Sequence, residues 1–331
     1  MIDESSIAIE FIDVALSDFG ASKLLFDGGF YPQALFMLQQ SLEKAAKAIL
    51  LKLKLVDVEG IGEKIGHSIK RVSLESIMLK IAMEFIDSIT YELLAHLNEV
   101  KLYASNDHRI AIDKLCNELK ENINQTITIA SSLLSKPARS RGEIYKMYGR
   151  VKVLSRKALS KLDEETLKGI NELMCEINME RFIKLIPNEI TKTITSLQKM
   201  LSSAMNYITS NEQRIEICKT YEEQMNRFVM KLQLAITLYM LILWYKPFEK
   251  KISQLRYPNH KMKHNPININ ENTTLTQWAK MIIEKINETD MLKCIKELVK
   301  EKIESQKCRE TLEFLKKDMI NTSSSITSLQ M

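Results

Sequence analysis

The sequence predicts an all-α protein. Glycine and proline, which interrupt helices, are scarce, with nine and six residues among 331. Apolar side chains recur at helical spacing over long segments. A hydrophobic fraction of 45% is enough to bury a substantial core, in one large domain or in two.

The first two helices are expected between residues 3 and 55, joined by a tight turn at Gly28-Gly29. Glycine accepts the positive φ that such a turn needs. The inward stripe of the second helix consists of Ala34, Leu38, Leu42, Ala45 and Leu50. Gln39, Glu43 and Lys47 lie largely off this stripe, and Glu43 and Lys47 are spaced for a surface ion pair.

Helical periodicity continues along the rest of the chain, interrupted at turn-forming residues. The helices expected there span residues 74–103, 109–134, 163–186, 188–208, 211–245, 276–286 and 291–319. The last of them is amphipathic and precedes a Ser/Thr-rich tail that we expect to be frayed.

The run from Leu232 to Tyr245 is the most apolar of the sequence and the one candidate for a membrane span. It is 14 residues long, whereas roughly 20 are needed to cross a bilayer. Lys231 and Lys246 bracket it. We therefore expect a helix that is buried in protein on most of its faces, and no membrane contact.

Charge and cysteine content set further limits. A net charge of +5 permits an anionic partner without requiring one. The five cysteines are scattered with no paired spacing, so neither a zinc site nor a disulfide framework is expected, and a reducing cytoplasm fits best. The chain opens with acidic Asp3 and Glu4, which is not the basic start of a signal peptide.

The most basic segment lies between residues 136 and 161, where nine Lys and Arg residues face one acid, Glu143. On a helix, Lys146, Arg150 and Lys157 fall on the side opposite the apolar residues. Such a face is suited to following a phosphate backbone, with an affinity that falls as salt rises. An ordinary solvated helix face is an equal alternative.

Several residues of the first helix pair form a string that is found in a known family, together with one histidine in the loop that follows. They are Gly29, Tyr31, Ala34, Phe36, Gln40, Glu43, Lys44, Lys47, Ala48 and His67. This string resembles the opening helices of HEPN domains, helical bundles of prokaryotic nucleotide-related and RNA-targeting systems. The resemblance implies an antiparallel four-helix bundle, here elaborated by additional helices. A second piece, Tyr245 followed by Arg256-Tyr257-Pro258-Asn259, resembles the Arg-Tyr-Pro signature before the last helix of many such domains.

The second piece favours a bundle that is split in sequence. We expect residues 1–73 and 212–290 to form it, with a helical insertion at 74–211 and an amphipathic helix and tail at 291–331. The alternative is a contiguous bundle at 1–135 followed by a second helical domain at 136–331. The resemblance also implies a homodimer, and a protein partner such as a nucleotidyltransferase.

Active ribonucleases of the HEPN class resemble one another in an arginine followed, after four to six residues, by a histidine. Here three residues separate Arg256 from His260, and seven separate it from His264. Neither spacing matches, so whether the chain is an enzyme stays open; these three residues are the catalytic candidates. Prolines flank both histidines and no carboxylate completes a ligand set, so we expect no metal and no other cofactor.

Three functions follow as hypotheses. The first is a protein that binds RNA or nucleotides in a prokaryotic defence or toxin-antitoxin system, with Arg256 and the basic residues Lys146, Arg150 and Lys157 as contacts. The second is a metal-independent endoribonuclease. The third is a non-catalytic helical module for dimerisation or partner binding.

Overall fold

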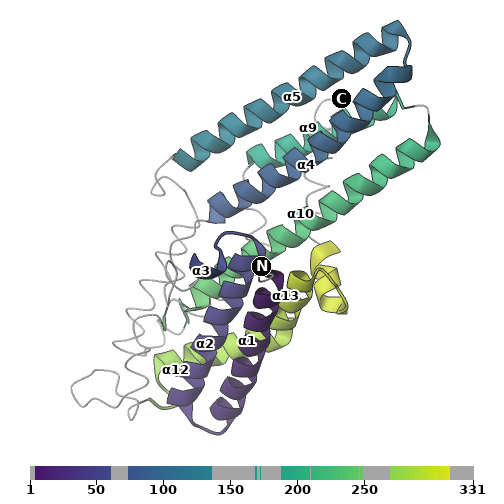
Figure 1. Cartoon of the computed structure of the whole chain (residues 1–331). Helices are drawn as coiled ribbons and strands as arrows, with labels where there is room; N and C mark the ends of the chain where they lie inside the picture. The colour runs from purple at the N-terminus through teal and green to yellow at the C-terminus, as the bar shows by residue number, and fades with distance from the viewer. Residues whose placement is uncertain are drawn as a thin grey trace. The chain divides into compact units, whose positions relative to one another are not determined.

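The computed structural model describes residues 4–60, 74–135, 188–208, 210–245, 247–248 and 269–313, together with 168, 169 and 172. Within these ranges every regular element is a helix, which confirms the predicted all-α class (Figure 1). The helices divide between two compact units, which we describe separately.

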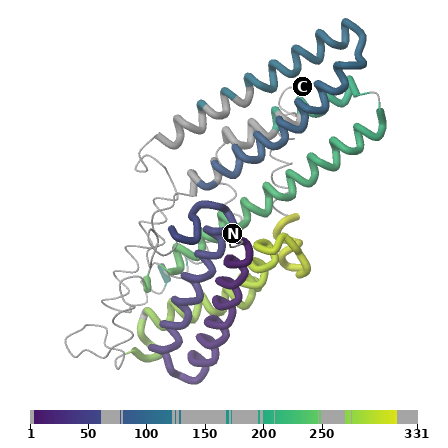
Figure 2. Tube along the Cα trace, in the orientation of Figure 1, coloured from purple at the N-terminus to yellow at the C-terminus, as the bar shows by residue number. Residues whose placement is uncertain are grey.

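Unit 1 holds most of the N-terminal and C-terminal helices. They are α1 (Glu4–Asp27), α2 (Tyr31–Lys52), the short α3 (Val58–Gly60), the part of α10 (Asn211–Tyr245) from Leu234 onward, α12 (Thr274–Thr289) and α13 (Met291–Lys300). Helices α1 and α2 run antiparallel and side by side, as the tube in Figure 2 shows. Helix α13 packs against both of them, and α12 packs against α2.

The turn between α1 and α2 lies at the predicted glycines. Gly29 has φ of 78°, a left-handed conformation that glycine adopts without steric cost. The amide of Phe30 donates to the carbonyl of Leu25 at 2.8 Å, which closes the end of α1. Pro32 lies in the first turn of α2, where its missing N–H has no helical partner to lose.

Helix α2 is buried on more faces than the sequence pattern indicated. Gln39 is fully buried and Glu43 is only 3% exposed. The prediction of a surface ion pair between Glu43 and Lys47 was therefore wrong about its location, although the pair itself forms at 2.8 Å. The reason is that α1 covers one side of α2 while α12 and α13 cover others, so polar positions off the apolar stripe are also enclosed.

The C-terminal half of α10 is a core helix, as predicted. By length and composition α10 is the one helix of the described residues that could cross a membrane, but 83% of its most apolar window is buried inside the protein. Trp244 is fully buried, and its backbone carbonyl accepts a hydrogen bond from the indole of Trp278 on α12 at 3.0 Å.

Unit 2 is formed by α4 (Leu74–Tyr103), α5 (Asn106–Ser135), α9 (Asn188–Met205) and α10 up to Gln233. The rings of Phe85 and Phe228 lie 4.8 Å apart in its core. Helix α5 begins at Asn106, three residues earlier than predicted. The guanidinium of Arg109 donates to the last carbonyls of α4, which allows a turn of only two residues.

The predicted single helix at 291–319 is interrupted. Helix α13 ends at Lys300, Glu301 takes a left-handed φ of 55°, and helical structure resumes at residue 306. The side chain of Glu297 accounts for the break, because it accepts hydrogen bonds from the amide of Ser305 and from its hydroxyl, each at 3.0 Å. Glu297 thus holds the start of the next helix beside α13.

A disulfide joins Cys294 of α13 to Cys308 of the helix that follows, with their Cα atoms 5.3 Å apart. The scattered cysteines gave no expectation of a disulfide framework, and this one bond is the disulfide that the described residues hold. The 14-residue separation is uninformative in sequence, because only the reversal at Glu301 brings the two cysteines together. Cys116 and Cys218 are free thiols.

Candidate functional site

The predicted functional residues fall into two groups. The following lie outside the described residues: His67, Lys146, Arg150, Lys157, Arg256, Tyr257, Pro258, His260 and His264. Their roles stay predictions. The described ones are Tyr31, Glu43, Lys44 and Lys47, all on α2. The last three lie at or beside a buried polar cluster, which is the candidate site.

This cluster, the α2 cluster, consists of Gln39, Glu43 and Lys47 on successive turns of α2 and Tyr245 at the end of α10. The Gln39 amide donates to the Glu43 carboxylate at 3.1 Å and to the Tyr245 hydroxyl at 2.9 Å. Lys47 Nζ donates to the other carboxylate oxygen at 2.8 Å. Gln40 donates to Gln39 Oε1 at 2.8 Å, which fixes the orientation of the Gln39 amide.

A second ion pair lies next to the α2 cluster. Lys44 of α2 donates to the carboxylate of Asp18 on α1. Asp18 is 8% exposed, whereas the Lys44 side chain keeps 27% of its surface in contact with solvent. Two cations, Lys44 and Lys47, therefore lie one turn apart on α2, each held in place by a carboxylate.

Burial raises the pKa of the Tyr245 phenol to about 12, and the negative charge of Glu43 adds to this effect. The hydrogen bond from Gln39 acts in the opposite direction and is the weaker influence. Tyr245 is therefore neutral at physiological pH and cannot act there as a phenolate base. It contributes a fixed hydroxyl dipole to the α2 cluster.

The arrangement has the features of a polar binding site and lacks those of a metal centre. A carboxylate, an ammonium group, a carboxamide and a phenol are held together inside a helical unit. Within the described ranges, no three histidine, cysteine or carboxylate side chains gather as a metal ion would require. Lys44 and Lys47 are suited to holding an anionic group at the edge of α2.

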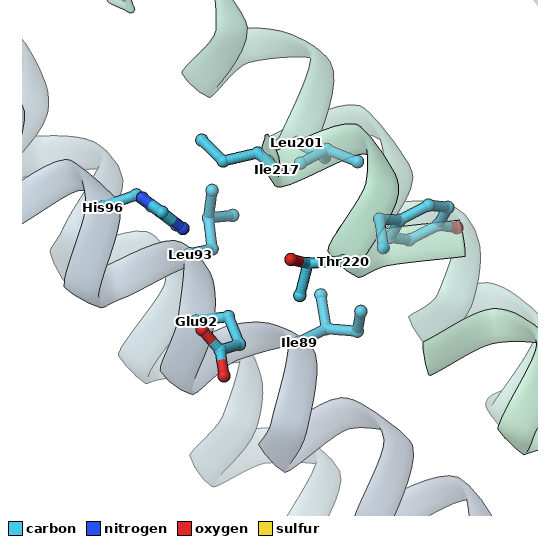
Figure 3. Close-up of a pocket in the computed structure, with 8 residues that line it drawn as sticks. Ile89, Glu92, Leu93, His96, Leu201, Ile217 and Thr220 are labelled. Carbon is cyan, nitrogen blue, oxygen red and sulfur yellow. The ribbon is translucent and has the colours of Figure 1, made fainter. Parts of the chain in front are cut away.

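A hollow in unit 2 was a second place to look for a site (Figure 3). It lies between α4, α9 and α10 and is lined by Ile89, Glu92, Leu93, His96, Leu201, Ile217, Thr220 and Tyr221. Its space is about 250 Å³ including the part open to solvent, but the enclosed part holds only about one water molecule. A nucleobase does not fit there without movement of the helices.

Comparison with known proteins gives one result. Residues 8–94, about a quarter of the chain, match the family model described as HEPN domain. This part of the chain is similar to HEPN domains. The predicted resemblance is thereby confirmed, and the match begins within α1, contains α2 and extends over the first two thirds of α4. No curated protein and no solved structure matches the chain.

Most of the α2 cluster lies within the residues that match the HEPN family model. Gln39, Glu43, Lys44 and Lys47 are inside the matched residues, and Tyr245 is outside them. Sequence reasoning identified Glu43, Lys44 and Lys47 by resemblance but gave Gln39 and Asp18 no role. The spacing of Gln39 and Glu43 by one helical turn was the available signal, and their burial was not visible in it.

Proposed function

We propose that this HEPN-domain protein binds RNA or a nucleotide in a prokaryotic defence or toxin-antitoxin system, with Lys44 and Lys47 of α2 contacting phosphate. The observation that supports this proposal is the buried pair of Glu43 and Lys47. The Glu43 side chain is only 4% exposed to solvent, and the Lys47 side chain is only 12% exposed. The HEPN match supports the choice of ligand class.

The burial of this pair is the first step of the argument. Removing two charges from water costs several kcal/mol, on the order of what their attraction returns, so a buried ion pair adds little net stability. Apolar side chains of similar size would fill the same space at no such cost. A buried charged cluster of this kind is therefore a candidate for a functional role.

The geometry of the cations is the second step. Lys44 and Lys47 are three residues apart, so their side chains leave α2 on the same side. Asp18 and Glu43 restrict the two ammonium groups to defined positions. Each ammonium group carries three donors and can keep its carboxylate while it binds a phosphate oxygen. Less side-chain entropy is then lost on binding.

Binding of fluorescent mixed-sequence single-stranded RNA, and of a nucleoside triphosphate, would test the proposal at low and moderate salt. We expect RNA affinity to fall steeply as salt rises. Lys44→Gln and Lys47→Gln should each weaken binding by about 10- to 100-fold, the value of a hydrogen bond to a charged group.

Lys52→Gln is the matched control, because Lys52 is also on α2 and is also paired with a carboxylate, that of Glu301 at 2.7 Å. It removes the same positive charge, but at a position outside the α2 cluster. Equal loss of affinity in Lys52→Gln and Lys47→Gln would show that the loss comes from the lower net charge alone. It would overturn the proposed contacts. Circular dichroism of each variant separates lost binding from lost folding.

The same assay decides between binding and cleavage. RNA cut by the parent protein but not by Arg256→Ala would make the chain an endoribonuclease. Salt-sensitive binding without cleavage, lost in the Lys146/Arg150/Lys157 triple alanine variant, would assign binding to the basic segment in place of α2. Absence of binding at low salt would leave a dimerisation or partner-binding module.

A further inference from the structure

We propose that the Cys294–Cys308 disulfide is a redox-dependent latch, which fastens the segment 305–311 to α13. This inference is independent of any RNA or nucleotide ligand. We call residues 305–311 the latch segment.

The surface to which the latch segment is fastened belongs to the core of unit 1. Helix α13 buries Leu292, Ile295, Leu298 and Val299, and it packs on both α1 and α2. Lys296 of α13 also pairs with Asp13 of α1. At the far end of α13, Glu301 accepts a hydrogen bond from Lys52 of α2 at 2.7 Å. The reversal point of the chain is thus tied directly to the helix that carries the α2 cluster.

Polar contacts hold the latch segment in place apart from the disulfide. Glu297 accepts from the amides of Glu304 and Ser305 at 3.1 and 3.0 Å. Lys307 donates to the backbone carbonyl of Glu288 at 2.6 Å and lies 3.6 Å from the Asp290 carboxylate. These contacts do not require the disulfide. After reduction they keep the two thiols near one another, so the bond can form again without refolding of unit 1.

Access to the sulfurs depends on movement of the latch segment. Cys294 is 9% exposed and Cys308 is 1% exposed. An external thiol therefore reaches the disulfide only when the latch segment lifts from α13. The rate of reduction should thus report the opening of the latch segment, and each polar contact that holds the segment should slow that rate.

The covalent step is a thiol–disulfide exchange with a glutathione-type couple. In the oxidising direction, one cysteine thiolate attacks oxidised glutathione, forms a mixed disulfide and releases one glutathione thiolate. The second cysteine thiolate then attacks the mixed disulfide and releases the second glutathione thiolate. The two cysteines lose two electrons and two protons in all, and glutathione is reduced by two electrons. Reduction of the latch is the reverse sequence.

The test uses the full-length chain equilibrated in buffers of different reduced-to-oxidised glutathione ratio. Alkylation followed by peptide mass spectrometry reports the state of Cys294 and Cys308. Brief trypsin digestion reports cleavage after Lys307 and Arg309, and circular dichroism reports folding. We expect the pair to change state across the glutathione series, with at least a fivefold rise in cleavage after reduction and no loss of helix content.

Two variants distinguish a latch from a simple cross-link. Glu297→Gln weakens the hydrogen bonds from Ser305 and should speed the reduction of the disulfide by dithiothreitol several-fold. Glu304→Gln is its control, because it removes an equal charge, one that pairs with the nearby Lys302 at 2.7 Å and does not hold Ser305, and its reduction rate should match the parent. Cys308→Ser should show the higher trypsin cleavage at every glutathione ratio.

Three results would overturn the proposal. The first is alkylation of both cysteines at every glutathione ratio, since no bond would then exist. The second is equal trypsin cleavage of oxidised and reduced protein, since the bond would then fasten nothing. The third is loss of helix content on reduction, since the bond would then be a structural cross-link and not a reversible latch.

Discussion

The amide of Gln39 donates a hydrogen bond to the hydroxyl of Tyr245 at 2.9 Å, across a separation of 206 residues in sequence. This bond links α2 to the end of α10 inside unit 1. It places a neutral phenol beside the buried carboxylate of Glu43, whose charge helps to raise the pKa of Tyr245. The stability of the folded protein should therefore depend on pH in the alkaline range.

The first prediction concerns that consequence. The pKa of Tyr245 rises from 10 in the unfolded chain to about 12 in the folded protein. Between pH 10 and pH 12 the folded protein therefore binds the phenolic proton more tightly than the unfolded chain does. The stabilisation that results is fully present below pH 10 and is lost as pH rises from 10 to 12. The loss is about 1.4 kcal/mol for each pH unit.

Absorbance titration of tyrosinate at 295 nm checks this prediction. Tyr245→Phe should remove the absorbance change that occurs near pH 12 and leave the changes near pH 10 intact. Removal of a change near pH 10 would contradict it. In denaturant, the stability difference between the parent and Tyr245→Phe should shrink as pH rises above 10.

The second prediction concerns the buried pair of Glu43 and Lys47. Lys47→Ala leaves the Glu43 carboxylate buried without its cation, and the expected cost is about 3 kcal/mol of unfolding free energy. The double variant Glu43→Leu/Lys47→Met removes both charges and should recover most of the loss. Urea denaturation followed by circular dichroism measures both values.

The exposed pair of Lys285 and Glu288, 3.7 Å apart, is the control for the second prediction. Lys285→Ala should change the unfolding free energy by about 0–1 kcal/mol, because water screens this pair. If Lys47→Ala were as mild as Lys285→Ala, the Glu43–Lys47 pair would not be buried in solution.

The third prediction compares two glycines of the α1–α2 hairpin. Gly29 has a positive φ, so Gly29→Ala should destabilise the protein by about 1 kcal/mol or more. Gly20 lies within α1, and a Cβ added there meets no atom within 4 Å. Gly20→Ala should therefore stabilise the protein by up to about 1 kcal/mol through helix propensity.

Thermal unfolding of the two alanine variants checks the third prediction. Opposite shifts of the melting temperature are expected for the same chemical change. A fall for both variants would mean that Gly20 is packed against a surface that the single chain does not supply.

The helices were the part of the fold that sequence could predict. Long 3.6-residue periodicity located α1, α4 and α10 to within a residue or two of their observed ends, because each has a continuous apolar stripe, whereas α2 ends three residues before the predicted limit at residue 55. Periodicity could not predict the break at Glu301. That break depends on a hydrogen bond from Ser305 to Glu297, a tertiary contact between two helices and not a local breaker residue.

The candidate site was predictable only in part. Glu43, Lys44 and Lys47 came from a resemblance, and their i,i+4 spacing predicted one ion pair correctly. Their burial depends on which helices cover α2, and this information is spread over α1, α12 and α13. The pairing of Lys44 with Asp18 needs the register of the α1–α2 hairpin. Hydrogen bonds from Ser22 to Ala34 and from Ser41 to Ala15 set that register.

The last prediction concerns the apolar end of α10, whose composition alone would also suit a membrane span. Leu241 is fully buried in unit 1, whereas Leu102 on α4 is 68% exposed. If α10 is a core helix, Leu241→Ala leaves a cavity and should lower the unfolding free energy by about 2–5 kcal/mol. Leu102→Ala should change it by about 0.5 kcal/mol or less.

A helix surrounded by lipid would lose little from Leu241→Ala in detergent-free buffer, and the parent protein would aggregate there. Equal melting temperatures for the two variants, with the parent recovered only in detergent, would therefore replace the core assignment with a membrane one.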